Sequence, residues 1–226
     1  RATLLFSIFM LAFLVASATA IARTGGATAA LSGTVMIGLL GTLYMGSGLR
    51  FDFREDVERM DVLKALPMSA TAVFVATLVP EVLLIIWLIL LAMLAHAILV
   101  GADLQLTLIA CSLLPPFAWI WLALDNAFFL IWPIRVVPGQ DGALQNMGRA
   151  SIFMVLRMVV LSVAVGLSIG LGFLLGGIAL RGLDLTPSTA TWIGTAGGWL
   201  LLMGFAVLTA RFGGSAFRRF DPAGLD

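Results

Sequence analysis

The sequence predicts an all-α protein: a polytopic membrane bundle of about six transmembrane helices with one short amphipathic helix outside the membrane. The chain has 226 residues, of which 61% are hydrophobic and only 11% charged, whereas soluble domains average about half apolar and about a quarter charged residues. It also contains six apolar stretches that are each long enough to cross a bilayer as a helix, which takes about 20 residues. These two observations exclude a water-soluble globule.

The six stretches follow one another along the whole chain. The third and fifth exceed the necessary length by about ten residues, so we expect tilt, extension beyond the bilayer, or a kink at Pro80 in the third. Pro115 and Pro116 are expected to bend the fourth. The predicted spans are residues 3–22, 29–49, 69–100, 105–132, 150–180 and 191–210.

The start of the chain has two interpretations. Residue 1 is Arg rather than Met, so we expect residues 1–226 to be a single transmembrane domain from a longer protein. The first stretch follows Arg1 and ends near small residues, a pattern that also fits a secretory signal peptide. Its length, and the second span directly after it, favour a transmembrane helix.

The distribution of basic residues predicts the orientation, because Lys and Arg close to spans are retained in the cytoplasm. With the amino end inside, the cytoplasmic segments contain ten of the thirteen basic residues, and the external loops contain only Arg23 and Arg181. The thirteenth, Arg157, lies within a span. We therefore expect both termini in the cytoplasm.

Several classes of function are excluded or unsupported by composition. The net charge is +1 and the basic residues are dispersed, so the sequence lacks the basic stripe of a nucleic-acid-binding protein. Cys111 is the only cysteine, which excludes an internal disulfide and a thiolate metal cluster. One histidine and scattered acids provide no spaced ligand set. We therefore expect no metal and no cofactor.

The only charge-rich run, residues 51–66, lies between the second and third spans and is predicted to form a helix. Asp52 followed by Glu55 fits an amino-terminal cap with its reciprocal glutamate, and Pro67 ends the helix. Apolar residues recur every three to four positions, which predicts one apolar stripe. The stripe consists of Phe53, Val57, Met60 and Leu63, and the charged face includes Arg54, Glu55, Glu58, Arg59, Asp61 and Lys64.

Such a helix lies along a surface, and two interpretations are open. It rests on the membrane interface as a solvated loop helix, or it docks a cytoplasmic partner, since acids and bases are concentrated here and nowhere else in the chain.

This layout resembles the permeases of type-2 ABC exporters. Two spans are followed by a short charged helix that runs into Leu63-Lys-Ala-Leu-Pro-Met-Ser69, then by a long third span and three more. The layout covers the whole chain, but only residues 54–69 are specific in sequence. The Asp52-Phe-Arg54 start and the Leu-Pro-Met-Ser form are similar to bacterial ABC exporter permeases. Many relatives carry Gly-Thr where this chain has Asp56-Val57, so the substrate is not specified.

The resemblance implies a permease of the bacterial cytoplasmic membrane that pairs into a dimer, in which residues 51–66 form the coupling helix touching an ATPase. The one lysine, Lys64, lies between Leu63 and Ala65 rather than in the Gly-Lys-Ser/Thr of a P-loop. An ATP-binding subunit is therefore expected as a separate chain, and this chain is not expected to be an enzyme. The main alternative is an assembly or structural membrane protein without transport activity.

Three ionisable residues lie inside predicted spans, where a charge is costly unless it is paired or faces water. Asp125 and Arg157 both lie about 11 Å from the cytoplasmic face, so we predict that they form an ion pair, with Asn126 as a nearby hydrogen-bond partner. The pair is either a static clasp or a moving gate. Glu81 lies about 18 Å deep beside Pro80, either protonated and bonded to a neighbouring helix or on a substrate or proton route.

A third hypothesis comes from Gly166-Leu-Ser-Ile-Gly170, which matches the Gly-x-Ser-x-Gly pattern of serine hydrolases. Together with His96 at a similar depth, Ser168 suggests an intramembrane serine protease. However, the motif lies within a helix, and glycines four residues apart are typical of helix packing. These glycines, and those between Gly33 and Gly46, predict closely packed helices.

Overall fold

The computed structural model describes residues 2–48, 53, 59–133 and 143–221. Over these ranges the chain is helical and contains no strand. Five helices are long and apolar enough to cross a membrane, which confirms the predicted all-α membrane bundle. They are α1 (Ala2–Gly48), α3 (Ala70–Val100), α4 (Leu104–Ile131), α5 (Ala143–Arg181) and α6 (Pro187–Arg219), and the short α2 (Met60–Lys64) lies between α1 and α3.

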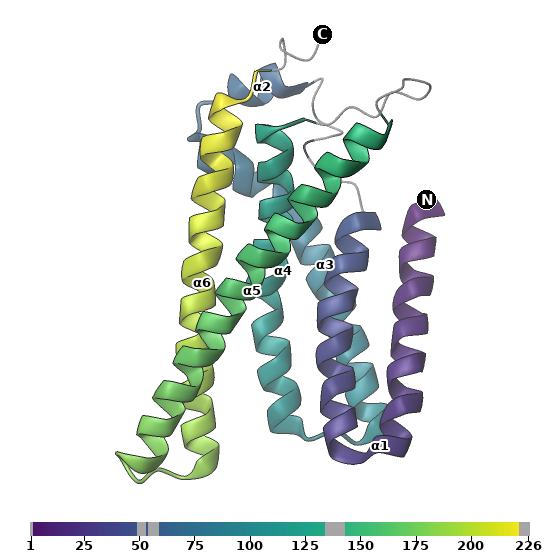
Figure 1. Cartoon of the computed structure of the whole chain (residues 1–226), viewed down its shortest axis with the longest axis vertical. Coiled ribbons are helices and arrows are strands. Elements are labelled where there is room, and N and C mark those ends of the chain that lie inside the picture. Colours follow the sequence, from purple (N-terminus) through teal and green to yellow (C-terminus); the bar gives the residue numbers. More distant parts are fainter. Residues whose placement is uncertain (1, 49–52, 54–58, 134–142, 222–226) are drawn as a thin grey trace.

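The first long helix, α1, comprises the first two predicted spans. Gly26 interrupts it with φ 71° and ψ −160°, which lies outside the helical region. Glycine fits this position because L side chains rarely adopt such a φ. The two halves of α1 run antiparallel, side by side (Figure 1). The expected six membrane-length segments are therefore present, two of them within α1.

Short capping interactions form the turns at one end of the bundle. Gly101 ends α3 in the left-handed conformation, and Asp103 Oδ1 accepts a hydrogen bond from the Leu106 N–H at the start of α4, at 2.8 Å. Thr186 caps α6 in the same way, with Pro187 in its first turn. These turns and Gly26 lie at one end of the molecule, the Gly26 end. The start of α1, the helix α2 and the end of α6 lie at the other, the α2 end (Figure 1).

Three prolines lie within helices that continue on both sides of them. Pro80 lies inside α3, and Pro115 and Pro116 lie inside α4. No residue of these helices is recorded outside helical φ/ψ, so the expected bends stay a prediction.

The last helix extends beyond its predicted span. The predicted span ends at residue 210, whereas α6 continues as a helix to Arg219. Hydropathy falls there, but Gly213 and Gly214 let the helix lie directly against Phe74 and Thr71 of α3. Close packing therefore maintains the helix where its composition turns polar.

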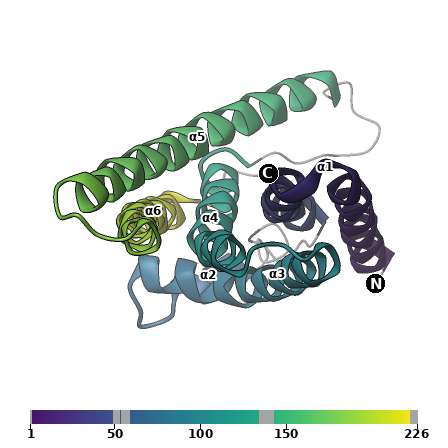
Figure 2. The ribbon, with the colours of Figure 1, turned by 90° about the horizontal axis from the view of Figure 1, so that it is seen from below.

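The central helix of the bundle is α4. It lies between the α1 and α3 pair on one side and the α5 and α6 pair on the other (Figure 2). Half of its most apolar window is buried inside the protein, the largest share among the long helices. The core therefore follows α4, and most of α5 faces outward.

Glycines bring α5 and α6 into backbone contact. A Cβ atom on Gly194 would lie 2.5 Å from the Gly172 carbonyl oxygen, and one on Gly198 would lie 2.8 Å from the Ser168 carbonyl oxygen. Small residues at such positions allow close approach, which is a main source of helix association in membranes. In contrast, α5 touches α4 over only a short stretch and crosses the bundle at a steep tilt (Figure 1).

We expect Gly194→Ala to lower the thermal stability of the purified protein in detergent. Alanine favours a helix over glycine by about 1 kcal/mol, but here its Cβ would push α5 away from α6, at a cost of about 1–3 kcal/mol. Gly204→Ala is the matched control because a Cβ on Gly204 meets nothing within 4 Å. Tryptophan fluorescence during heating provides the measurement. A melting temperature for Gly194→Ala equal to that of Gly204→Ala would contradict the close contact.

Candidate functional site

The segment between α1 and α3 is attached to the bundle by a buried aromatic residue. Phe53 is fully buried, and its ring stacks on Phe74 of α3 and packs at a tilt against Phe217 of α6, with both centroid distances 5.5 Å. The Phe53 N–H donates a hydrogen bond to Asn126 Oδ1 of α4, at 3.2 Å. Three helices therefore hold this one residue.

The helix predicted over residues 51–66 is described only in part. Its helical portion is Met60–Lys64, and Phe53 lies in a turn. The prediction that Phe53 is helical is therefore wrong: the residue lies in a turn, and its ring packs against α3 and α6. Lying outside the described residues are Asp52, Arg54, Glu55, Val57 and Glu58.

The apolar stripe of this segment faces the protein. Met60, like Phe53, is fully buried, and Leu63 is half-buried against the core. Both interpretations of the segment, a helix at the membrane interface and a docking helix, therefore stay open. Phe53, Met60 and Leu63 anchor the segment to the bundle.

The opposite face of the segment is exposed and mixes charges with apolar side chains. The charged residues Arg59, Asp61 and Lys64 are exposed, and Lys64 Nζ also donates a hydrogen bond to the Phe220 carbonyl oxygen after α6. Large apolar side chains beside them are exposed as well. They are Val62, Leu66 and Met68, with exposed fractions of 68%, 41% and 52%.

The predicted ion pair between α4 and α5 is present. Arg157 Nη1 contacts Asp125 Oδ1, and both side chains are largely withdrawn from the surface. The Arg157 guanidinium also lies over the Trp121 ring, with Cζ 4.4 Å from the ring centroid, which is a cation–π geometry. The pair therefore satisfies two charges that would each be costly alone at this depth.

The expected hydrogen bond between Asn126 and this ion pair is wrong. Asn126 Nδ2 donates to the Leu122 carbonyl oxygen, at 3.1 Å, and Oδ1 accepts from Phe53. Consecutive residues of a helix face different directions, so Asp125 points toward α5 while Asn126 points toward Phe53. Asp125 and Asn126 therefore connect α5 and the segment that contains Phe53 through one turn of α4.

Aromatic rings also pack near the Asp125–Arg157 ion pair, where α5 meets α4. The Phe153 ring of α5 stacks on Phe128 of α4 at a centroid distance of 5.5 Å and lies 6.2 Å from the Trp132 ring. Phe128 also makes an edge contact with Phe212 of α6. Together with the ion pair, these rings hold α5 against α4 where the two helices meet.

The other predicted polar residues lie inside the bundle. Glu81 is 3% exposed, so its carboxyl group is turned away from lipid. Its proposed bond to a neighbouring helix stays a prediction. No group of three or more His, Cys, Asp or Glu side chains that could hold a metal occurs within the described ranges.

His96 ties the two halves of α1 to α3. Its Nε2 lies 3.2 Å from the Ala30 carbonyl oxygen, and its Nδ1 lies 3.0 Å from the Thr19 hydroxyl. A carbonyl oxygen only accepts, so Nε2 carries a proton, and in the neutral imidazole the Thr19 hydroxyl donates to Nδ1. Ser168 instead donates to the Ala164 carbonyl oxygen of its own helix, at 2.7 Å. Among the described residues no hydrogen bond joins Ser168 to His96, so the arrangement of a serine protease is not formed.

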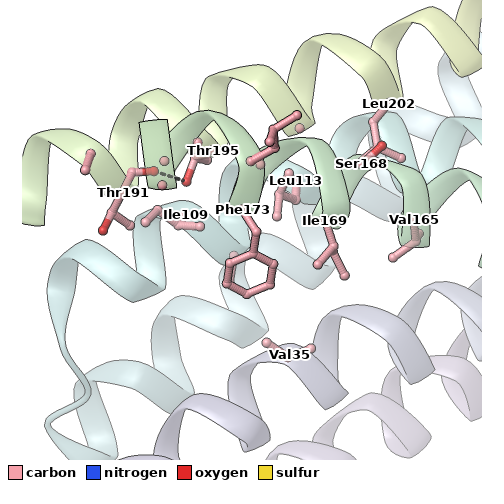
Figure 3. Close-up of a pocket in the computed structure, with 18 of the residues that line it drawn as sticks. Val35, Ile109, Leu113, Val165, Ser168, Ile169, Phe173, Thr191, Thr195 and Leu202 are labelled. Carbon is pink, nitrogen blue, oxygen red and sulfur yellow. Dashed lines mark hydrogen bonds between the residues drawn. The ribbon is translucent and has the colours of Figure 1, made fainter. Parts of the chain in front are cut away.

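A cavity of about 1080 Å³ lies between the second half of α1, α4, α5 and α6. Figure 3 shows apolar side chains lining it, with Phe173 of α5 opposite Val35 of α1 and with Ser168, Thr191 and Thr195 along its length. The sequence did not predict this cavity, because its volume depends on the tilt of α5. The contact between Arg157 and Trp121, in contrast, could have been predicted from the sequence. Trp121 precedes Asp125 by one helical turn, the spacing at which side chains share a face, so a partner of Asp125 also lies near Trp121.

We expect Asp125→Asn and Arg157→Gln each to destabilise the protein by about 2–3 kcal/mol, because each leaves one partner inside the membrane without its counter-ion. The double variant should lose at least ~1 kcal/mol less than the sum, which is the signature of a direct interaction. Unfolding in mixed detergent micelles measures these values. Arg211→Gln changes an exposed arginine of α6 and should remain within about 0.5 kcal/mol of the parent. Additive effects of the two substitutions would contradict the pair.

Comparison with protein-family models, with curated proteins and with solved structures finds no match to this chain. A function for it therefore has to be inferred from its own residues and from the resemblance noted for residues 54–69.

Proposed function

We propose that the chain is the membrane-spanning permease subunit of an ABC exporter of the bacterial cytoplasmic membrane. A separate ATPase subunit binds and hydrolyses ATP and displaces the segment of residues 51–66. The single observation that carries this proposal is the anchoring of Phe53 by α3, α4 and α6. A displacement at this point reaches three membrane helices at once.

The exposed face of the segment supports docking of a protein partner. Val62, Leu66 and Met68 lie beside Asp61 and Lys64, and protein interfaces commonly combine an apolar centre with a polar rim. The same end of the molecule carries Arg218 and Arg219 at the end of α6. Basic residues are retained in the cytoplasm, where ATP is available to a partner.

The contacts inside the bundle support transmission from the docking face to α5. Phe53 is bonded to Asn126, and the adjacent Asp125 is paired with Arg157. A movement of the segment would therefore act on α4 and, through the ion pair, on the tilted α5. Helix α5 forms one wall of the large cavity. A structural or assembly protein would need the anchor but not this connection.

Charge reversal in the docking segment should release the ATPase. We expect the pair of substitutions Glu55→Lys and Glu58→Lys to lower the amount of ATPase that co-purifies with the tagged permease by about tenfold, because like charges across an interface cost several kcal/mol. Arg23→Glu, at the Gly26 end, is the control for general effects on the membrane protein. Quantitative mass spectrometry of the purified complex measures the ratio. If the unmodified chain retains no ATPase, or if the reversal changes nothing, the permease proposal fails.

The orientation has its own test. In a Cys111→Ala background, Asp61→Cys at the α2 end and Asp184→Cys at the Gly26 end each provide one thiol. A maleimide that does not cross membranes should label Asp184→Cys on intact cells, whereas Asp61→Cys should react only after the cells are opened. Labelling of Asp61→Cys from outside would reverse the orientation and remove the docking face from the cytoplasm.

A further inference from the structure

The cavity between α1, α4, α5 and α6 has a single charged residue at one end. Arg181, the last residue of α5, is the only Lys, Arg, Asp or Glu among the residues that line it. The Arg181 side chain is exposed, and its guanidinium makes no ion pair or hydrogen bond with another described residue. The remaining walls are aliphatic and aromatic side chains, glycines and a few hydroxyl groups.

The cavity is long as well as apolar. On α5 its lining runs from Val165 to Arg181, which corresponds to about 24 Å of helix. One leaflet of a bilayer contributes about half of the 30 Å hydrocarbon core. The lining is therefore longer than one leaflet is thick, so an acyl chain fits along it. The volume of about 1080 Å³ lies just above the usual range for ligand pockets.

The hydroxyl groups inside the cavity do not make it a polar site. Ser168 donates to the Ala164 carbonyl oxygen, Thr191 to Pro187 and Thr195 to Thr191, each within its own helix. Their donors are thus already used by the backbone. The ligand that fits is apolar over its length and carries negative charge only at the Arg181 end.

We propose that this cavity binds one anionic phospholipid from the surrounding bilayer, with an acyl chain between α4, α5 and α6 and the phosphate on Arg181. Part of the apolar lining also faces the outside of the protein: Phe173, Leu174 and Ile178 are exposed by 79%, 60% and 52%. The cavity therefore borders on lipid. The charge complementarity of a guanidinium and a phosphate selects the head group. This inference does not depend on the proposed transport function.

The test uses the purified chain in lipid nanodiscs that contain photoactivatable phosphatidylglycerol or phosphatidylcholine, with the reactive group in the acyl chain. After illumination, mass spectrometry maps the labelled peptides. We expect the cavity residues of α4 and α5 to be labelled about fivefold more by phosphatidylglycerol, because one basic residue at the membrane surface favours an anionic lipid by about that factor. Equal labelling by the two lipids would overturn the proposal.

Two pairs of variants separate the head-group contact from the acyl-chain contact. Arg181→Gln should reduce the preference to about one, whereas Arg23→Gln, which removes an exposed arginine of α1 that lines a different and smaller cavity, should retain it. Gly177→Phe fills the cavity, because a Cβ there meets nothing within 4 Å, and should lower labelling of the cavity by both lipids.

Gly170→Phe is the matched control for the second pair, since Gly170 is equally open but does not line the cavity. Undiminished labelling in Gly177→Phe, or a preserved preference in Arg181→Gln, would overturn the proposal. Arg181→Gln alters only an exposed side chain, so it tests the head-group contact even where filling the cavity lowers stability.

Discussion

The absence of water in a bilayer determines both how this chain folds and how its helices associate. Each span satisfies its own backbone hydrogen bonds, and lipid tails are as apolar as the side chains, so burying leucine against leucine stabilises association little. Helix contacts then depend on a few close or polar interactions. In this protein they include the glycine contacts of α6 with α5 and α3, the Asp125–Arg157 pair and the hydrogen bonds of His96.

These contacts are more extensive between α5 and α6 than between α5 and α4, and the proposed mechanism depends on that difference. α5 is fixed to α6 by its glycines but to α4 mainly by one ion pair and a group of aromatic rings. The same turn of α4 carries Asn126, which holds Phe53 in the exposed segment. A force applied to the segment would therefore reach α5 at its short contact with α4, and α5 also forms one wall of the cavity.

The sequence predicted the features that depend on length, hydropathy and depth. The spans and the Asp125–Arg157 pair follow from those quantities alone. It did not predict features that depend on rotation about a helix axis or on contacts between distant segments. Asn126 points away from the ion pair, Phe53 is held by rings far away in the chain, and the cavity results from the tilt of α5. The last turns of α6 also depend on such contacts, because Gly213 and Gly214 pack directly on α3.

The contacts between the segment of residues 51–66 and the end of α6 have a consequence for the order in which the protein folds. Lys64 bonds to Phe220, which is 156 positions later in the chain, and Phe53 packs on Phe217. Synthesis proceeds from the amino end, so the first part of this surface leaves the ribosome long before the residues that secure it. Under the proposed function, a partner ATPase would therefore find a complete docking surface only after the final helix is inserted.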